Sequence, residues 1–327
     1  MAIPRTVLGV LALVIAPLGL TVTPWAHGSS LIYVGMIPAL VACLHGYRFA
    51  LATAALTGVL AAAVVWANPH PLGAVLLMVV VGAAVGVSSV RGWHTVASVA
   101  TAWPAVLLIG APLELPTPEW ITDAGGSVAV AALLACAGGL WGIVVVATLL
   151  PSLPRSSFQP LDLTSAIVYA VGLAVVLGVC TFVAATWWHG TNAGWVLLTV
   201  LVIARPAYSD TRRRVIERSA GTVAGGAAAA LLSVLLPVPI VLMIVGGAAL
   251  AAAVLLQLKH ADYLIYSLSL TAAIVLLNAG TVDVLALDVQ RVGFTIAGAA
   301  VTAIALTVVQ LLFSRRRGDR QEPTVTK

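Results

Sequence analysis

Charged residues are scarce in this sequence. They make up 8% of the 327 residues, whereas hydrophobic residues make up 61%. A soluble globular chain carries about 25% charged residues, so the composition excludes a soluble protein. Apolar runs of about 17–25 residues, the length that a helix needs to cross a bilayer, recur along the chain. Alternating ten-residue segments of the membrane β-barrel type do not occur. The sequence therefore predicts an all-α polytopic membrane protein, because backbone polar groups in lipid must pair within helices.

Signatures of catalysis and of metal binding are also missing. The GxxxxGK[ST] phosphate loop, the GxSxG elbow and the HExxH motif are absent, so we expect neither an enzyme nor ATP-driven pumping by this chain alone. The 6 histidines stand near predicted span ends, and none pairs at metal-ligand spacing. The 3 cysteines lie singly in apolar runs and indicate no disulfide framework. We therefore expect no catalytic residue, no metal and no cofactor.

Turn-forming residues divide the apolar sequence into about twelve predicted transmembrane helices. The first six lie near 7–24, 29–46, 48–67, 71–90, 94–112 and 127–150. The second six lie near 165–188, 192–206, 218–236, 240–257, 262–279 and 291–313. The first run follows Arg5 and could be read as a signal peptide. It lacks a clear small-x-small cleavage site, so we interpret it as a retained helix.

The basic residues indicate an orientation. With the N-terminus in the cytoplasm, all of the 16 Lys and Arg residues except Arg291 fall on the cytoplasmic side. The outer loops instead hold Glu114, Glu119, Asp123, Asp283 and Asp288. This asymmetry follows the positive-inside rule and predicts that both termini are cytoplasmic. The net charge of +5 is therefore explained by membrane orientation rather than by nucleic-acid binding.

The two halves of the sequence resemble a tandem repeat. Arg48 precedes an alanine-rich helix as Arg218 does, and the acidic loop at 114–123 corresponds to that at 283–288. Because each half has six spans, both repeats point the same way across the membrane, which predicts two parallel six-helix repeats. The predicted organisation is a first membrane repeat over 1–150, a cytoplasmic linker over 151–164, a second repeat over 165–313 and a basic cytoplasmic tail over 314–327.

Arginines gather between the eighth and ninth predicted spans. A positive mouth raises the local concentration of anions, and arginine binds a carboxylate through two parallel hydrogen bonds. Arg218 is the first candidate because it is the last charge before the apolar helix resumes. Its repeat counterpart Arg48 has the same setting. The predicted substrate-binding set is Arg218, Arg48, Arg205, Arg212, Arg213, Arg214 and Thr222. The alternatives are that these arginines extend to the interface, bind lipid headgroups or only set the topology.

Acidic residues are missing from the interior of the predicted spans, so the sequence shows no proton relay. Asp262 and Asp162, both near span ends, are the nearest candidates. A monoanion that leaves the cell needs no relay, because about 100 mV across the membrane contributes about 2.3 kcal/mol per unit charge.

Several motifs occur together between Trp195 and Leu236. They are Trp195 with Leu198-Thr199, Arg205-Pro206, the Thr211-Arg212 turn and Arg218-x-x-Gly221-Thr222-x-x-Gly225. In these motifs the sequence resembles the fusaric acid resistance (FUSC) family, and the resemblance extends loosely to Leu312. The family is regarded as one of aromatic-acid exporters, and it looks related to the plant aluminium-activated malate transporters, which are anion channels.

The sequence departs from this family in two places. Arg205-Pro206 stands where many members have Gln-Pro, and 151–163 is too short for the cytoplasmic domain that many members carry. Both departures concern the substrate more than the fold.

We therefore predict a multi-pass inner-membrane exporter or channel for organic carboxylate anions, a class that the resemblance extends to aromatic acids. Its predicted partners are a small organic anion and the lipid bilayer, with no nucleic acid, and the resemblance implies a homodimer. The alternative is a non-transporting membrane scaffold that binds a protein partner or anionic lipid through its basic cytoplasmic face.

Overall fold

The computed structural model describes residues 5–20, 23, 25, 28–113, 115, 124–150, 155–259, 262–278 and 284–318. Over these ranges the chain is helical and no β-strand occurs. In the first half the α-helices are α1 (Arg5–Leu20), α2 (Ser29–Cys43), α3 (Tyr47–Ala67), α4 (Pro71–Ser88), α5 (His94–Leu107) and α6 (Ala124–Leu149), with a short 3-10 helix η2 (Ser89–Arg91) after α4. In the second half they are α7 (Leu163–Trp187), α8 (Gly194–Ile203), α9 (Tyr208–Leu235), α10 (Pro239–Leu258), α11 (Tyr263–Leu277) and α12 (Val284–Gly318).

Each predicted span coincides with one of these α-helices, but the helices differ in length. Within the described residues, 7 helices are long and apolar enough to cross a membrane, and shorter apolar helices accompany them. The 10 residues of α8 rise only about 15 Å, half of the hydrocarbon core of a bilayer. The chain is thus an all-helical, multi-pass membrane protein. The twelve-span layout and the side of each terminus stay predictions.

Two helices of the second half begin earlier than the sequence predicted. Helix α9 begins at Tyr208 rather than near 218, and α12 begins at Val284 rather than near 291. Helix α12 also continues to Gly318, into the predicted tail. The reason is that hydropathy locates the apolar centre of a helix, whereas its polar ends continue until a backbone signal stops them. As a result, the basic cluster after Arg205 is helical, and Asp288 lies within α12.

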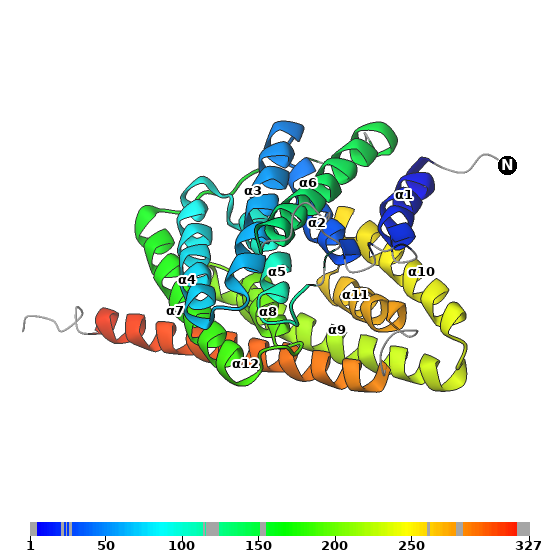
Figure 1. Cartoon of the computed structure of the whole chain (residues 1–327). Coiled ribbons are helices and arrows are strands. Elements are labelled where there is room, and N and C mark those ends of the chain that lie inside the picture. The colour runs from blue at the N-terminus through cyan, green and yellow to red at the C-terminus, as the bar shows by residue number, and fades with distance from the viewer. Residues whose placement is uncertain are drawn as a thin grey trace, which may run out of the picture.

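Corresponding helices pack in the same pairs in the two halves. Helices α2 and α3 both pack against α6, and α8 and α9 both pack against α12. Helices α4 and α7 join the halves by packing along each other, and α5 packs against α8. Figure 1 shows α9 and α12 side by side along one edge of the molecule, with α11 beside α9. These pairings agree with the tandem repeat, which remains a prediction.

Glycines allow the backbones of several helix pairs to lie close together. A Cβ atom on Gly82 of α4 would lie 2.8 Å from the Cα of Ala174 on α7. A Cβ on Gly221 of α9 would lie 2.7 Å from the backbone oxygen of Leu264 on α11. Small residues of this kind let helix backbones pack closely in membranes. Helices α9 and α11 are therefore held at a fixed, short separation beside the candidate site.

Candidate anion-binding site

A polar cavity of about 390 Å³ lies where the two halves meet, and we call it the vestibule. Helices α2, α5, α8, α9, α10 and α11 contribute to its wall, together with the segment before α7. Its lining includes Arg205 and Arg214, and the described residues that line it include no aspartate or glutamate. The vestibule therefore has a positive wall. Anions are attracted to such a cavity because low-dielectric walls strengthen the field of the two arginines.

Arg205 is held firmly at the wall of the vestibule. Its backbone N–H donates to the hydroxyl of Thr211 (2.9 Å), which in turn donates to the Arg205 carbonyl (3.0 Å). The side chain is only 8% exposed, and its Nη1 donates to the Thr95 hydroxyl (3.4 Å). Its buried Nε has no hydrogen-bond partner among the described residues. The Arg-Pro turn thus places a donor of Arg205 in the vestibule wall with nothing bound to it.

Other polar groups of the vestibule also lack partners. The Nδ1 of His94 and the hydroxyl of Tyr263 are buried, and neither makes a hydrogen bond within the part of the chain that the structure describes. The guanidinium of Arg214 lies over the Tyr263 ring, 4.8 Å from its centroid. A buried polar group without a partner is costly, which points to a polar ligand or water in this space.

The predicted linker forms one wall of the vestibule. The N–H of Ser156 donates to the Leu44 carbonyl (2.9 Å), and the ring of Phe158 stacks on that of His45 with 4.3 Å between centroids. Gly92 has φ of +75°, and a Cβ atom there would lie 2.6 Å from the backbone nitrogen of Gln159. These contacts fix the linker against the first half and give the vestibule a defined shape.

A second group of charges, which we call the arginine pair, lies between α8, α9, α11 and α12. It consists of Arg218 on α9 and Arg291 on α12, and each side chain is only 1% exposed. The two guanidinium groups repel each other, and both interact electrostatically with Tyr266 of α11. Tyr266 also lines the vestibule.

The arginine pair has few partners within the part of the chain that the structure describes. The Nε and Nη2 of Arg218 and all three nitrogens of Arg291 are buried without hydrogen bonds among the described residues. The ring of Trp195 supports Arg291, with 3.9 Å from the guanidinium carbon to the ring centroid. Buried charges are normally paired, so two unpaired guanidinium groups mark a place where an anion is expected.

The structure divides the predicted substrate-binding set into three groups. Arg218 belongs to the arginine pair, and the Thr222 hydroxyl lies 3.5 Å from that of Ser267, which donates to the Arg218 carbonyl (3.3 Å). Arg205 and Arg214 line the vestibule. The side chains of the remaining members are exposed at the surface: Arg48, Arg212 and Arg213.

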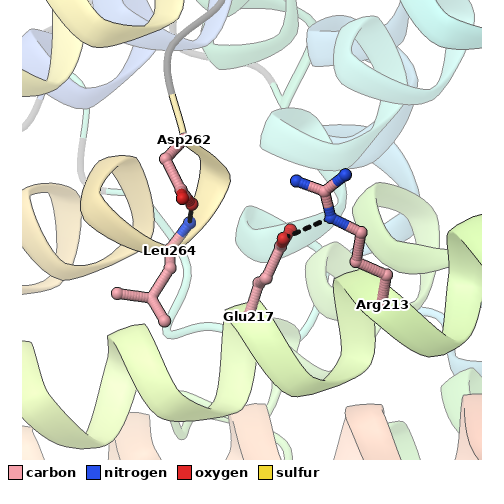
Figure 2. A network of polar contacts seen from close by, with 4 residues as sticks. All are labelled: Arg213, Glu217, Asp262 and Leu264. Atoms are coloured by element: carbon pink, nitrogen blue, oxygen red, sulfur yellow. Dashed lines mark hydrogen bonds and ion pairs between the residues drawn. The ribbon is translucent and has the colours of Figure 1, made fainter.

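Figure 2 shows that the side chains of Arg213 and Asp262 make contacts with residues close by in the sequence. The Nε of Arg213 bonds to a carboxylate oxygen of Glu217, one turn further along α9. The carboxylate of Asp262 accepts the N–H of Leu264 (2.9 Å) and so caps α11. Asp162 caps α7 in the same way, and the N–H of Ser165 lowers the pKa of its carboxyl group. Both aspartates are exposed caps, a position that does not suit a buried proton relay.

The sequence did not identify two residues of the site, Arg291 and Trp195. Arg291 is predicted on the outer side at the start of the last span; it lies within α12, where it interacts electrostatically with Arg218, and its side of the membrane stays a prediction. Trp195 follows Trp187 and Trp188 closely in the sequence. Those two are exposed, whereas Trp195 is 7% exposed and lies under Arg291. The one signal that could have found Arg291 is its position as the single basic residue against the positive-inside pattern.

A comparison with known families bears on this region. Residues 179–308 match the family model described as fusaric acid resistance protein-like. This region of the chain is therefore similar to that family. No curated protein and no solved structure was found to match the chain. The fusaric acid resistance-like region contains both arginines of the pair and both arginines of the vestibule, whereas Arg48 lies outside it.

Proposed function

We propose that this protein carries organic carboxylate anions across the inner membrane, as an exporter or a channel. The observation that carries the proposal is the vestibule, a cavity of about 390 Å³ whose described wall holds two arginines and no carboxylate. It lies in a multi-pass membrane protein with a fusaric acid resistance-like region. A polar, positive cavity between membrane helices suits the binding of an anion that has left water.

The wall of the vestibule has groups that can contact both the carboxylate and the organic remainder of an anion. Arg205 and Arg214 provide the positive charge, and Arg205 has a donor without a partner. Tyr263 and Gln257 add neutral polar groups, and Trp103 adds an aromatic surface. Ligand sites combine apolar surface with a few placed polar groups in this way. An anion with one carboxylate and an organic remainder fits such a wall.

The membrane potential supplies a driving force for export. At about 2.3 kcal/mol per unit charge for 100 mV, an interior-negative potential sustains an outward gradient of about fifty-fold for a monoanion. No phosphate-binding loop is required for this process. The proposal therefore needs only a path for the anion and a site that admits it.

Flux into liposomes that hold the purified full-length protein tests this function. A panel of carboxylates is offered under an imposed potential, and uptake is followed for the wild type, Arg205→Gln and Arg214→Gln. The matched control is Arg212→Gln, which removes an exposed arginine from the same helix as Arg214. We expect flux to follow the potential and to fall about tenfold or more in the two vestibule variants, as for loss of a charged hydrogen bond.

The controls separate transport from its alternatives. Equal loss of flux in Arg212→Gln would indicate a general effect of surface charge and would contradict a role for the vestibule. Absence of flux for every carboxylate, with correctly inserted protein, would overturn transport and favour the scaffold.

A further inference from the structure

We propose that Arg218 and Arg291, with Arg291 stacked on Trp195, form a binding site inside the helix bundle for the carboxylate group of an anion. The proposal rests on the transport function above and adds the residues that hold the transported group. The sequence singled out Arg218 alone, and only the packing of α9 against α12 brings Arg291 to it.

Charge balance is the first argument for a bound anion. Both side chains are 1% exposed, and removing each guanidinium from water costs several kcal/mol unless a partner compensates. Asp288, one turn before Arg291 on α12, interacts electrostatically with Arg291, but its own Oδ1 is buried without a hydrogen bond to any described residue. One carboxylate also cannot neutralise two arginines. The cluster therefore keeps a net positive charge that an added monoanion would balance.

The free donors of Arg218 identify the class of anion. Its Nε and Nη2 lie on one edge of the guanidinium, and both are buried without partners. The two N–H bonds on this edge are parallel, at the spacing of the two oxygens of a carboxylate. A planar carboxylate can thus bind to Arg218 through two hydrogen bonds. A spherical halide cannot use both donors equally well.

The stacking of Arg291 on Trp195 leaves its donors free in the same way. The ring covers one face of the guanidinium at 3.9 Å, whereas the N–H bonds point outward in the guanidinium plane. Trp195 is itself fixed, because it is 7% exposed and its ring meets that of Trp103 edge-on with centroids 6.5 Å apart. The indole therefore sets the orientation of Arg291 without occupying any of its hydrogen-bonding atoms.

Tyr266 relates the proposed site to the vestibule. This residue lines the vestibule and interacts with both arginines of the pair. A carboxylate bound between the arginines would thus leave the rest of the anion directed past Tyr266 into the larger cavity. In this arrangement Arg205 and Arg214 attract the anion into the vestibule, and the arginine pair holds its carboxylate.

The corresponding place in the first half cannot form a second site. Arg48, the repeat counterpart of Arg218, is exposed, and α6, the counterpart of α12, contains no charged residue. Gly138 of α6 instead packs directly against the backbone oxygen of Ile32 on α2. We therefore expect one such site in each chain.

Binding of acetate to the purified full-length protein in detergent tests the site. Thermal unfolding is measured at increasing acetate, with chloride at the same ionic strength as the control anion. A ligand that binds only the folded state raises the melting temperature, and the rise grows with the logarithm of ligand concentration over Kd. We expect acetate to stabilise the wild type, and Arg218→Gln and Arg291→Gln to raise the acetate Kd at least tenfold. The control Arg213→Gln, on the exposed face of α9, should keep the wild-type Kd.

The melting temperatures measured without acetate test whether the two arginines have only a structural role. If the arginines only support packing, each glutamine variant should unfold at a lower temperature without acetate. If they form an empty anion site, removal of one charge relieves the repulsion, and the melting temperature without acetate should stay equal or rise. The Arg218→Lys variant adds a check that does not depend on loss of charge. It keeps the charge but loses the paired donors, so the proposal expects it too to weaken acetate binding.

The experiments can reject the proposed site and the proposed transport function independently of each other. Wild-type flux in liposomes together with unchanged acetate binding in Arg218→Gln and Arg291→Gln would overturn the site and leave transport standing. Acetate binding that depends on both arginines, in a protein without flux, would support the site and overturn transport. Equal stabilisation by chloride and acetate would contradict the assignment to a carboxylate.

Discussion

The guanidinium of Arg291 lies over the indole ring of Trp195, with 3.9 Å between the guanidinium carbon and the ring centroid. The two residues are almost a hundred positions apart in the sequence, on α12 and α8, and both are buried. The contact provides Arg291 with a stabilising surface but with no negative charge. It explains how a second arginine can be held next to Arg218 while its hydrogen-bond donors remain available.

Trp195→Leu should weaken anion binding without removing a charge. The loss of a buried cation–π contact of about 0.5–2 kcal/mol is expected to raise the acetate Kd by about 2- to 30-fold, because Arg291 loses its fixed orientation. Titration calorimetry on the purified protein measures the change. The control is Trp188→Leu, an exposed tryptophan that packs on Phe294 instead. A similar Kd for wild type and Trp195→Leu would contradict this role of the ring.

Asp288→Asn should strengthen anion binding. The carboxylate interacts with Arg291, so its removal increases the positive potential of the arginine pair while keeping the side-chain shape. An effect on the order of tenfold on the acetate Kd is expected when a neighbouring negative charge is removed. The matched control is Glu217→Gln, since Glu217 is already paired with Arg213. Weaker binding in Asp288→Asn would show that Asp288 helps to hold the anion instead.

Gly221→Ala should destabilise the contact between α9 and α11. The added Cβ would lie 2.7 Å from both the Leu264 oxygen and the Ser267 Cβ, so one helix must move. We expect a loss of about 1–3 kcal/mol in the free energy of unfolding, as for other overpacked sites. Chemical unfolding in detergent measures it. Gly172→Ala is the matched control, because its Cβ meets no atom within 4 Å and alanine favours a helix. Equal stability of the two variants would refute the proposed close packing.

Asn68→Ala should destabilise the junction between α3 and α5. The buried Nδ2 of Asn68 donates to the carbonyl oxygens of Leu107 (3.1 Å), Leu108 (3.1 Å) and Gly110 (3.0 Å), which end α5. Its loss leaves buried carbonyls without a donor, at a cost of about 2–4 kcal/mol in the free energy of unfolding. Unfolding in detergent again provides the measurement. Asn192→Ala, which removes only an exposed hydrogen bond to Gln290, is the control, and a loss in Asn68→Ala no larger than in the control would count against this role.

Helix α9 shows which features of the site can be predicted from the sequence. The run of arginines and the Arg-Pro turn are local patterns, so the sequence alone predicts Arg218 as the last charge before an apolar helix. Hydropathy did not locate the polar start of that helix, which begins at Tyr208. The reason is that Thr211, bound back to the Arg205 backbone, sets the turn, and its hydroxyl contacts depend on the folded backbone.

The different environments of the arginines on α9 could not be predicted from the sequence. The exposed Arg212 and Arg213, the vestibule residue Arg214 and the buried Arg218 all lie within seven consecutive positions of α9. Their composition and spacing gave no basis for separating them. The rotation of the helix against α11 and α12 turns each side chain toward a different environment.

By itself, the sequence determined that the chain is a bundle of membrane helices and that the arginine cluster between 205 and 218 lies in its fusaric acid resistance-like region. Composition and the lengths of apolar runs are enough for this, because a bilayer admits few structures. Only the tertiary structure decided which charges meet. Arg291 joins Arg218, and Trp195 supports it, because α8, α9 and α12 pack together, and a contact between distant helices leaves no local pattern in the sequence.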